Sequence, residues 1–522
     1  MRKKKIISAD EAALWVKDEM TITTSGFVAC ALPEALNSAL ERRFLETGAP
    51  KNLTLFYASS QGNQDGSGAE HFAHAGMTKR VIGGHWNMVP KLGQMVLDNQ
   101  IEGYNLPQGP LCKLYREIAS HSPGCITSVG LGTFVDPRNG GGKLNSISTE
   151  DYVDLFELNG REYLLFKSFP LDIAFVRGTY ADEYGNVTVE HEVAPLEVTS
   201  LTQAVHNCGG KVIVQVEQVV PHGTLDPKLV KIPGIYVDAL VVCARPEDHA
   251  QCRGCAYDGS MTGDYKVTVE RAAGIPMSAK KIIARRAAMQ LKAGAVVNLG
   301  IGTPEYVAKV AAEEGIVGEI VLTVENGPIG GIPQGGCKFG GAVNPEALID
   351  QPYQFDFYDG GGLDMAFLGL AQGDKNGNIN VSKFGPRIAG CGGFINITQN
   401  SKQVFFCGTF TAGGLQTHIE DGRLIIDQEG REQKLVSEVE QITFSGLYAR
   451  HGNQTVMYIT ERAVFELRAD GVYLTEIAPG IDLQSQILGQ MGFLPKIPQD
   501  GIKTMDPRIF TETTMGLGKH FN

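Results

Sequence analysis

The 522-residue sequence lacks a long apolar run, an excess of basic residues and the cysteine spacing of a disulfide-rich domain. No uninterrupted apolar stretch approaches the roughly 18 residues of a membrane-spanning helix, so we expect no membrane association. Lysine and arginine total 46 against 58 aspartate and glutamate, a net charge of −12, which argues against binding to nucleic acid. The ten cysteines are scattered, so we expect a reduced, cytoplasmic protein.

Several familiar catalytic and phosphate-binding motifs are also missing. There is no Gly-x-Ser-x-Gly, the motif of a serine nucleophile elbow. Gly140-Gly141-Gly142-Lys143 is followed by Leu144 instead of serine or threonine, so it is no P-loop. Gly130-Leu131-Gly132 and Gly300-Ile301-Gly302 both lack the third glycine of a dinucleotide-binding turn.

Two short patterns resemble metal ligands, but each has a plainer interpretation. Cys252-Arg253-Gly254-Cys255 is a lone Cys-x-x-Cys, which we interpret as a surface loop and not as a zinc or redox site. His71-Phe72-Ala73-His74 lacks the glutamate and the spacing of a helical zinc-protease site, and is more typical of a partly buried helix face. We therefore expect no metal.

Glycine, in contrast, is abundant. It makes up 64 of 522 residues, about 12%, against a usual share of roughly 7%, and no Gly-X-Y period accompanies it. Such an excess indicates many tight turns, or backbone that lies close to a ligand. Twenty of the glycines fall between Gly327 and Gly414.

Strand and helix patterns alternate along the chain. Leu53–Tyr57 and Lys211–Val216 are typical of buried strands, whereas the stretches from Pro33 and across Tyr306–Ala312 are typical of helices. This alternation predicts an α/β fold with mostly parallel sheets. The length exceeds that of one ordinary domain. A charged stretch gives way to a new helix pattern around Gly274–Ser278, so we expect domains at 1–275 and 276–522.

The two halves of the chain resemble each other. Asp172–Val189 aligns without gaps on Asp364–Val381, at an offset of 192 residues (364 − 172), and both copies contain an Asp-x-x-Gly-Asn turn between strands. A second similarity pairs Ser25–Glu34 with Leu299–Glu305, each a glycine turn followed by a Pro-Glu helix start. Two similarities in the same order predict two related α/β domains.

Glu325 is the strongest candidate for a reactive side chain. The apolar run Ile320–Val324 predicts a buried strand, and Glu325 stands where that strand ends. The carboxyl ends of parallel strands are where α/β sheets bind their ligands. A turn or helix-capping glutamate is the alternative.

Three further segments have residues suited to binding. Phe355–Tyr358 is interpreted as an aromatic strand, and the following Gly360, Gly361 and Gly362 would allow close approach to its backbone. Gly392 and Gly393 open an apolar segment whose N–H groups could hold an anion. Gln108 places an amide donor in a turn, although by itself it would be a surface residue.

These residues carry a resemblance to a known family. Val324-Glu325-Asn326-Gly327 resembles the Ser-Glu-Asn-Gly motif of class I coenzyme A transferases, and Ser25–Pro33 resembles their Gly-Gly-Phe-x-x-x-Gly-x-Pro motif. The resemblance covers almost the whole chain and is greatest for the single-chain propionate and acetate CoA-transferases of anaerobic bacteria. The sequence departs from these motifs at Ser25, Ala31 and Val324.

The resemblance implies a covalent mechanism at an active site between the two domains. Glu325 would attack an acyl-CoA thioester, form a mixed anhydride and then hold CoA as a glutamyl thioester, in a ping-pong cycle. Gln108 and the N–H of Gly392 or Gly393 would stabilise the oxyanions. Further substrate and CoA contacts would come from Ser25, Gly26, Phe27, Asn326, Gly327, Gly360, Gly361 and Gly362.

The expected activity is that of a short-chain acyl-CoA:carboxylate CoA-transferase acting on acetate, propionate, butyrate or lactate. CoA would serve as substrate and covalent intermediate, with no permanently bound cofactor, and the enzyme would be a homodimer or homotetramer. Two alternatives stay open: an acyl-CoA hydrolase that uses the same glutamate, and a non-catalytic ligand-binding α/β protein.

Overall fold

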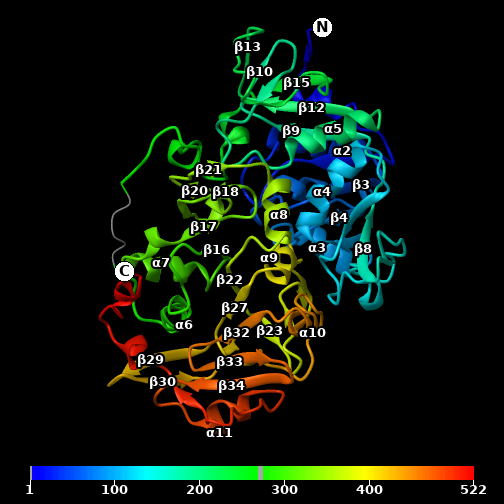
Figure 1. Ribbon diagram of the computed structural model, residues 1–522. Coiled ribbons are helices and arrows are strands. Elements are labelled where there is room, and N and C mark those ends of the chain that lie inside the picture. Colours follow the sequence, from blue (N-terminus) through cyan, green and yellow to red (C-terminus); the bar gives the residue numbers. More distant parts are fainter. Residues whose placement is uncertain (1–2, 269–273, 522) are drawn as a thin grey trace. The chain divides into compact units, whose positions relative to one another are not determined.

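A computed structural model describes residues 3–268 and 274–521, which form two compact units (Figure 1). Unit 1 comprises Met1–Val267, Val324–Asp356 and Gly385–Asn396. Unit 2 comprises Thr268–Thr323, Phe357–Phe384 and Ile397–Asn522. Two later segments of the chain thus belong to the unit that the N-terminal half builds. The boundary expected at 275/276 stays a prediction.

Unit 1 is built on an eight-stranded sheet in which all neighbouring strands are parallel. Its order is β1 (Lys5–Ile6), β15 (Ala239–Val242), β12 (Lys211–Val216), β9 (Ile173–Arg177), β2 (Thr21–Thr24), β3 (Leu53–Tyr57), β4 (Thr78–Gly83) and β5 (Glu102–Asn105). The strands β3 and β12 have the predicted bounds. Helices α4 and α5 pack on each other beside the sheet (Figure 1). The helices are α1 (Ala9–Ala13), α2 (Glu34–Thr47), α3 (Pro90–Leu97), α4 (Gln108–Ala119) and α5 (Val198–Asn207).

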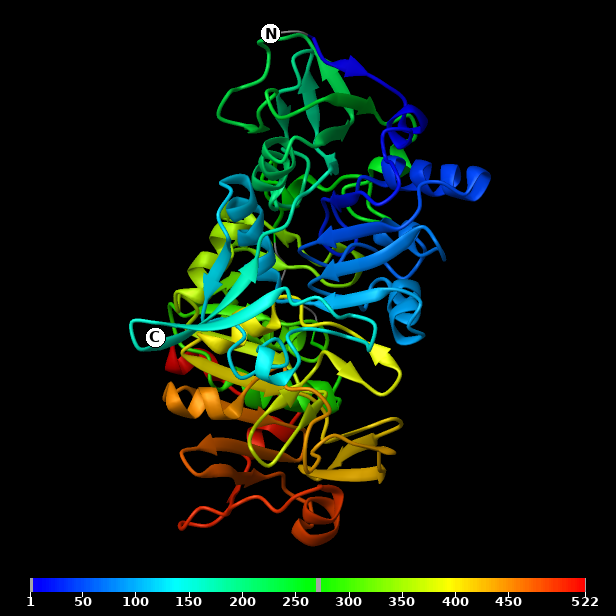
Figure 2. The same cartoon turned by 90° about the vertical axis from the view of Figure 1, so that its right-hand side faces the viewer.

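Smaller elements, most of them antiparallel, complete unit 1. The hairpin β7–β8 turns at Asn159 and Gly160, which both have positive φ, as an Asn-Gly hairpin turn requires. Figure 2 shows it as the long cyan pair of strands. The bounds are β6 (Gly124–Thr127), β7 (Val153–Leu158), β8 (Arg161–Lys167), β10 (Tyr180–Asp182), β11 (Val187–Thr188), β13 (Gln218–Val220), β14 (Val230–Ile232), β18 (Pro328–Ile329), β19 (Ile332–Pro333), β20 (Ala342–Val343), β21 (Ala347–Leu348) and β26 (Arg387–Ile388).

Unit 2 contains a mixed sheet whose first five strands are parallel. Phe367 and Phe405 stack in its core, with ring centroids 4.7 Å apart. The strands in order are β17 (Val321–Thr323), β16 (Val296–Leu299), β22 (Met365–Gly369), β27 (Gln403–Cys407), β32 (Thr455–Ile459), β33 (Ala463–Arg468), β34 (Gly471–Ile477) and β35 (Lys503–Thr504). Two mostly parallel α/β units confirm the predicted fold class.

The remaining elements are short. The helices are α6 (Ala279–Ala288), α7 (Glu305–Glu313), α8 (Gln351–Asp359), α9 (Phe394–Gln399), α10 (Gly446–His451) and α11 (Leu483–Gln486). The strands are β23 (Gln372–Gly373), β24 (Ile379–Asn380), β25 (Lys383–Phe384), β28 (Thr411–Ala412), β29 (Gln416–Glu420), β30 (Arg423–Gln428) and β31 (Glu432–Gln433). Across residues 3–268 and 274–521, no helix combines the length and apolar character needed to cross a membrane.

The internal repeat is present in the two units, as the sequence predicts. Strands β9 and β22 both begin and end 192 residues apart, and β11 and β24 do the same. Just before these strands, Asp172 Oδ2 accepts the N–H of Thr21 at 2.7 Å, and Asp364 Oδ2 accepts the N–H of Val296 at 2.9 Å. Each aspartate thereby ties the start of a neighbouring strand to the same place in its own sheet.

The Asp-x-x-Gly-Asn turn is built identically in both copies. Asp182 Oδ1 accepts the N–H groups two and four residues later at 2.9 Å each, and its Oδ2 accepts the amide of Asn186 at 2.8 Å. Asp374 makes the same three bonds at 2.9, 3.1 and 3.0 Å, the last from Asn378. Both aspartates are 2% exposed, so each satisfies three donors that water cannot reach freely.

One sequence interpretation was wrong. Phe355–Tyr358 is not a strand but part of helix α8. Phe355 and Tyr358 are fully buried while Tyr353 and Phe357 are 58% and 42% exposed, which is a helical period and not strand alternation. The glycines that follow end this helix, because Gly361 and Gly362 donate to carbonyls within its last turn.

The duplicated turn predicts equal effects of substitution in the two units. We expect Asp182→Ala and Asp374→Ala each to lower the free energy of unfolding by about 1–3 kcal/mol, because each leaves buried donors unsatisfied. Glu157→Ala, on the exposed face of β7, is the matched control and should stay within about 0.5 kcal/mol. Urea denaturation monitored by fluorescence checks this, and a loss no larger than the control's at either site would contradict it.

Candidate functional site

Glu325 lies in a tight turn directly after β17. Its turn is closed by two backbone bonds, from Val324 N–H to Pro328 at 2.9 Å and from Gly327 N–H to Val324 at 3.1 Å. The chain then enters β18, which pairs antiparallel with β21. Glu325 is half-buried. Glu325 therefore lies at the end of a strand, in a turn whose backbone is fixed by the hydrogen bonds of neighbouring residues.

The two residues after Glu325 fix the shape of this turn. Asn326 is fully buried and its Nδ2 donates to the carbonyl of Gly340 at 2.8 Å. Gly327 has a φ of +138°, and a Cβ there would lie 2.2 Å from the carbonyl oxygen of Ile349. Only glycine fits at this position, because any side chain would push the turn away from the segment beneath it.

The Ser25–Phe27 segment meets the Glu325 turn through Gly340. Phe27 stacks on Phe339 with ring centroids 5.7 Å apart, and a Cβ on Gly340 would lie 2.5 Å from the Phe27 ring. Gly340 is also the residue whose carbonyl holds Asn326. The structure thus brings together the two segments that carry the family motifs.

Ser25 and Gly26 shape the start of this segment. The hydroxyl of Ser25 accepts the N–H of Arg177 at 3.1 Å, and its own N–H donates to Phe175. Gly26 has a φ of +140°, and a Cβ would lie 2.7 Å from the Leu32 side chain. Ser25 thereby ties the start of the loop after β2 to β9, and Gly26 leaves room for the Leu32 side chain of the same loop.

Gln108 is the first residue of α4 and lies against Gly392. Its N–H donates to the Gly392 carbonyl at 2.9 Å, and Gly392 N–H donates to the Gly84 carbonyl at 2.7 Å. Asn105 completes the junction, because its Oδ1 accepts the N–H of Cys391 at 2.9 Å and its Nδ2 donates to Gly84 at 2.6 Å. The segment 385–396 is therefore held to the carboxyl edge of the unit 1 sheet by backbone and amide bonds.

The Gln108 side chain itself is buried and has an unused donor. Gln108 is 2% exposed, and its Nε2 has no hydrogen-bond partner among the described residues. Buried polar atoms are almost always bonded, so this donor suits a bound oxygen atom. The N–H of Gly392 already donates to Gly84, which leaves the Gly393 N–H as the backbone group that we propose for the same role.

Gly360, Gly361 and Gly362 do not join this assembly within unit 1. They follow α8 and belong to unit 2, where a Cβ on Gly362 would lie 2.3 Å from the Phe357 ring. Their contact with CoA stays a prediction. Conversely, Asn105, Gly340 and His85 take part in the geometry and were assigned no role from the sequence. For Asn105 and His85 the only signal was a position at or near the carboxyl end of a strand, and for Gly340 there was none.

The two patterns set aside as metal ligands have other partners. His71 bonds Glu34 at 2.7 Å and Glu41 at 2.6 Å, and although burial lowers its pKa, these carboxylates raise it to about 9. Cys252 is not in an exposed loop, because it is fully buried in a small apolar cluster with Cys30. The described residues contain no group of three or more potential ligands arranged to hold a metal ion.

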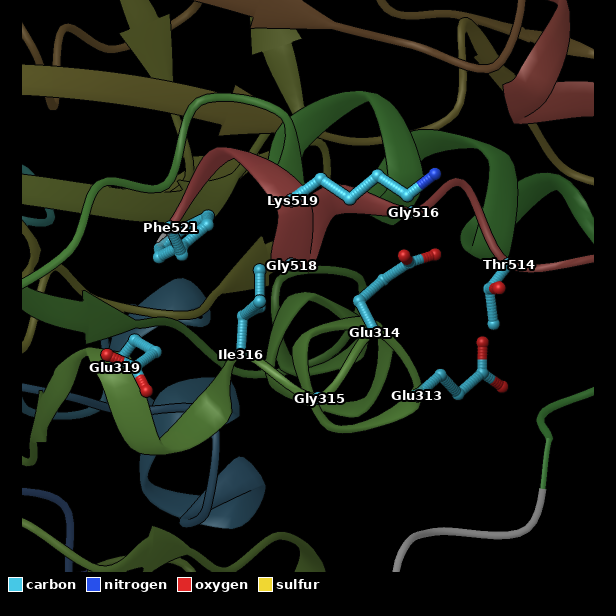
Figure 3. A pocket seen from close by; sticks show the side chains of 10 residues that line it. All are labelled: Glu313, Glu314, Gly315, Ile316, Glu319, Thr514, Gly516, Gly518, Lys519 and Phe521. Carbon is cyan, nitrogen blue, oxygen red and sulfur yellow. The ribbon is translucent and has the colours of Figure 1, made fainter.

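A cavity of about 440 Å³ in unit 2 contains none of the predicted site residues (Figure 3). It lies between the end of α7 and the last residues of the chain. Figure 3 shows the Glu314 carboxylate directed toward the segment that carries Gly516, and this carboxylate accepts the N–H groups of Met515 and Leu517. Glu314 therefore holds the C-terminal segment in place.

A second carboxyl group lies buried beside α4. Glu197 precedes α5, is 1% exposed, and neither of its side-chain oxygens has a partner among the described residues. Burial raises the pKa of Glu197 to about 8. Burial and the nearby Glu197 also raise the pKa of the Cys112 thiol on α4. The helix that begins with Gln108 thus packs against a carboxyl group that is neutral at pH 7.

This buried carboxyl group predicts a pH-dependent stability. The pKa of Glu197 is 4.5 in the unfolded chain and about 8 in the folded protein. The wild type therefore loses stability as the pH rises between these two values. Glu197→Gln cannot ionise, so its advantage over the wild type should grow by up to about 1.4 kcal/mol per pH unit and level off above pH 8. Chemical denaturation at pH 5, 6.5 and 8, with Glu157→Gln as control, checks this. An advantage that does not change with pH would show that Glu197 is ionised or exposed.

Together, the fold and the site define an α/β protein in which Glu325 and the buried donor of Gln108 belong to the same unit. The comparisons identify the class more closely. The family model for coenzyme A transferase matches residues 6–243. The acetate CoA-transferase YdiF of Escherichia coli K12 is 43% identical over 513 residues, which cover 98% of this chain and 96% of that protein. The caffeate CoA-transferase of Acetobacterium woodii is 46% identical over 518 residues, 98% of both chains.

A solved structure agrees. The crystal structure of the acyl-CoA transferase YdiF from E. coli O157:H7, in a thioester complex with CoA, has a TM-score of 0.93 at 42% identity and covers 98% of this chain and 97% of that chain. The chain therefore belongs to the coenzyme A transferase family, as its motifs predicted. It is an enzyme of the CoA-transferase type, which removes the alternative of a non-catalytic binding protein.

Proposed function

We propose that this enzyme transfers CoA between a short-chain acyl-CoA and a free carboxylate, with Glu325 as the nucleophile. The observation that carries the proposal is the turn at Glu325. Asn326 bonds this turn to Gly340, which packs on the Phe27 ring, and the turn lies in the same unit as the unused donor of Gln108. The relatives named above as acetate and caffeate CoA-transferases support the same reaction class.

The chemistry suits a carboxylate. A Glu325 oxygen adds to the thioester carbonyl, and CoA leaves as the thiolate, which gives a mixed anhydride. The thiolate then attacks the glutamyl carbonyl carbon, so the first acid leaves as its carboxylate and CoA remains on Glu325 as a thioester. A second carboxylate reverses these steps. No general base is needed, because ordinary glutamate is ionised at pH 7.

Each addition places negative charge on a carbonyl oxygen. We propose that Gln108 Nε2 and the Gly393 N–H stabilise it, since a fixed donor costs no reorganisation when the charge develops. Water must be kept from the anhydride and the thioester. The apolar cluster of Phe27, Ala194 and Phe339 contacts Gly340 beside the Glu325 turn. This apolar surface would exclude water there. Ser25, Gly26 and Phe27 would then face the acyl group, and Gly360–Gly362 would contact CoA.

The covalent intermediate gives a direct test. Incubation with acetyl-CoA and no acceptor should raise the intact mass by that of CoA less one water, with the label on the peptide that contains Glu325. Glu325→Gln should abolish the adduct. Glu346→Gln is the matched control, because Glu346 is exposed on the same segment, and it should leave the adduct unchanged.

Two other outcomes are informative. Free CoA that accumulates without an adduct and without an acceptor would favour a hydrolase. An unchanged mass in folded wild-type protein, with no CoA released, would contradict the role of Glu325.

Acid preference is a separate prediction. We expect acetate, propionate, butyrate and lactate to be better acceptors than caffeate, by at least about tenfold in kcat/KM, because discrimination by a pocket is worth about 1–3 kcal/mol per methylene and more for a ring that does not fit. A panel of acceptors with acetyl-CoA as the fixed donor measures this ratio. A higher kcat/KM for caffeate would place the enzyme with aromatic-acid transferases instead.

We also propose a homodimer or homotetramer located in the cytoplasm. A reducing compartment is compatible with the ten cysteines, all of which are free thiols. Sedimentation velocity of the purified protein would determine the oligomeric state, and a single monomeric species would contradict the first part of this proposal.

A further inference from the structure

His85 lies in the loop that follows β4, beside the segment that carries Gly392. It forms a β-bridge with Gly390, and the next two residues, Trp86 and Asn87, donate their N–H groups to Ala389 at 2.8 and 3.0 Å. A Cβ on Gly390 would lie 2.9 Å from the His85 Cα. The two backbones are therefore in direct contact, and the position of His85 relative to Gly392 is fixed.

The His85 ring and the Gln108 amide lie on the same glycine. A Cβ on Gly392 would be 3.4 Å from His85 Cδ2 and 3.7 Å from Gln108 Oε1. His85 Nδ1 and Gln108 Nε2 are both buried, and neither has a hydrogen-bond partner among the described residues. The atoms nearest to Gly392 are a ring carbon and the amide oxygen, and each of the two side chains also carries a buried nitrogen without a partner among the described residues, which is unusual in a native interior and indicates a polar ligand close to this glycine.

The His85 ring is neutral at physiological pH. Burial lowers its pKa to about 4, and the positive charge of Arg387 on β26 contributes in the same direction. One ring nitrogen therefore carries a hydrogen and the ring carries no charge. A neutral donor gains strength as negative charge develops on an oxygen, whereas a fixed cation would also bind the free carboxylate tightly and accelerate the reaction less.

We propose that His85 is a second side-chain donor of the oxyanion site, and that its Nδ1–H and the Gln108 Nε2–H bind the same carbonyl oxygen of the acyl group or of the glutamyl thioester. This inference rests on the proposed function. No proton moves: the oxygen gains negative charge when a carboxylate or thiolate adds to the carbonyl carbon, and it loses that charge when the leaving group departs. His85 touches the reacting atoms in this scheme and is a catalytic residue.

The choice of variants separates hydrogen bonding from packing. His85→Leu removes the donor and keeps an apolar side chain, while His85→Asn retains an amide nitrogen one bond beyond Cγ, where Nδ1 is in histidine. Gln108→Leu is the reference for loss of one donor. His206→Leu, at an exposed histidine near the end of α5, is the matched control.

We expect His85→Leu to lower kcat by about 10²–10³, comparable with Gln108→Leu, with a smaller change in KM. His85→Asn should recover most of the rate, and His206→Leu should equal the wild type. Thermal denaturation of each variant, together with the rate of CoA adduct formation measured by quenched-flow mass spectrometry, completes the readout.

The outcomes distinguish the two proposals. If wild-type protein forms the adduct and transfers CoA but His85→Leu does so at the same rate, the role of His85 is overturned and the proposed function stands. Equal losses in His85→Leu and His85→Asn would show that the imidazole acts through packing, which also overturns the inference. If folded wild-type protein neither forms the adduct nor transfers CoA, the proposed function fails, and the assignment of His85 fails with it.

Discussion

Close contact between backbones at glycine is the constraint on which the site depends. Segments 324–356 and 385–396 meet the N-terminal part of unit 1 at places where a side chain would not fit: Gly340 against the Phe27 ring, and Gly390 against the His85–Trp86 backbone. Replacing either glycine would separate elements that must touch, so the constraint is steric and not only conformational. The high glycine content between Gly327 and Gly414 thus has a local purpose at these two contacts, while other glycines in the range, such as Gly361, end helices.

This packing creates the electrostatic character of the site. Backbone N–H and carbonyl groups of Gly84, Gln108 and Gly392 are used up in holding the segments together, so they are not available to a ligand. Beside these bonds, two side-chain nitrogens, Gln108 Nε2 and His85 Nδ1, have no partner among the described residues. A carboxylate nucleophile, the role proposed for Glu325, needs no base to activate it in such a setting. The neighbouring Glu197 adds no charge either, because burial keeps it protonated at pH 7.

Local patterns in the sequence were sufficient for the parts of the structure that depend on local interactions. The strands Leu53–Tyr57 and Lys211–Val216 have the predicted bounds, since a buried parallel strand needs only a short β-branched run. The Asp-x-x-Gly-Asn turn was recognisable because three of its bonds are made within five residues. Phe355–Tyr358 was misassigned because aromatic residues favour strands on average, while here their burial follows a helical period.

Contacts between distant segments could not be predicted in the same way. Glu325 was identified by its place at a strand end and by the motif around it, but its support by Gly340 and Phe27 depends on how three loops pack. Likewise, nothing near His85 in the sequence shows that Gly392 lies against its ring. A histidine in a polar loop would be expected to be solvated, with a normal pKa, and only the packing of residues 385–396 on the loop after β4 buries it.

The repeat allows the framework that the two units share to be compared with the loops in which they differ. The two units share strands, an aspartate that ties neighbouring strands and the same three-bond turn. They differ in the loop after the corresponding strand. After β2, the loop continues through Gly26 to a buried Phe27 that stacks on Phe339, whereas after β16 the equivalent Ile301 is 48% exposed. The framework is the same, and what distinguishes unit 1 is two later segments of the chain, 324–356 and 385–396, which carry Glu325 and Gly392. Glu325 and Gly392, two of the residues proposed for catalysis, thus lie in segments outside the shared framework.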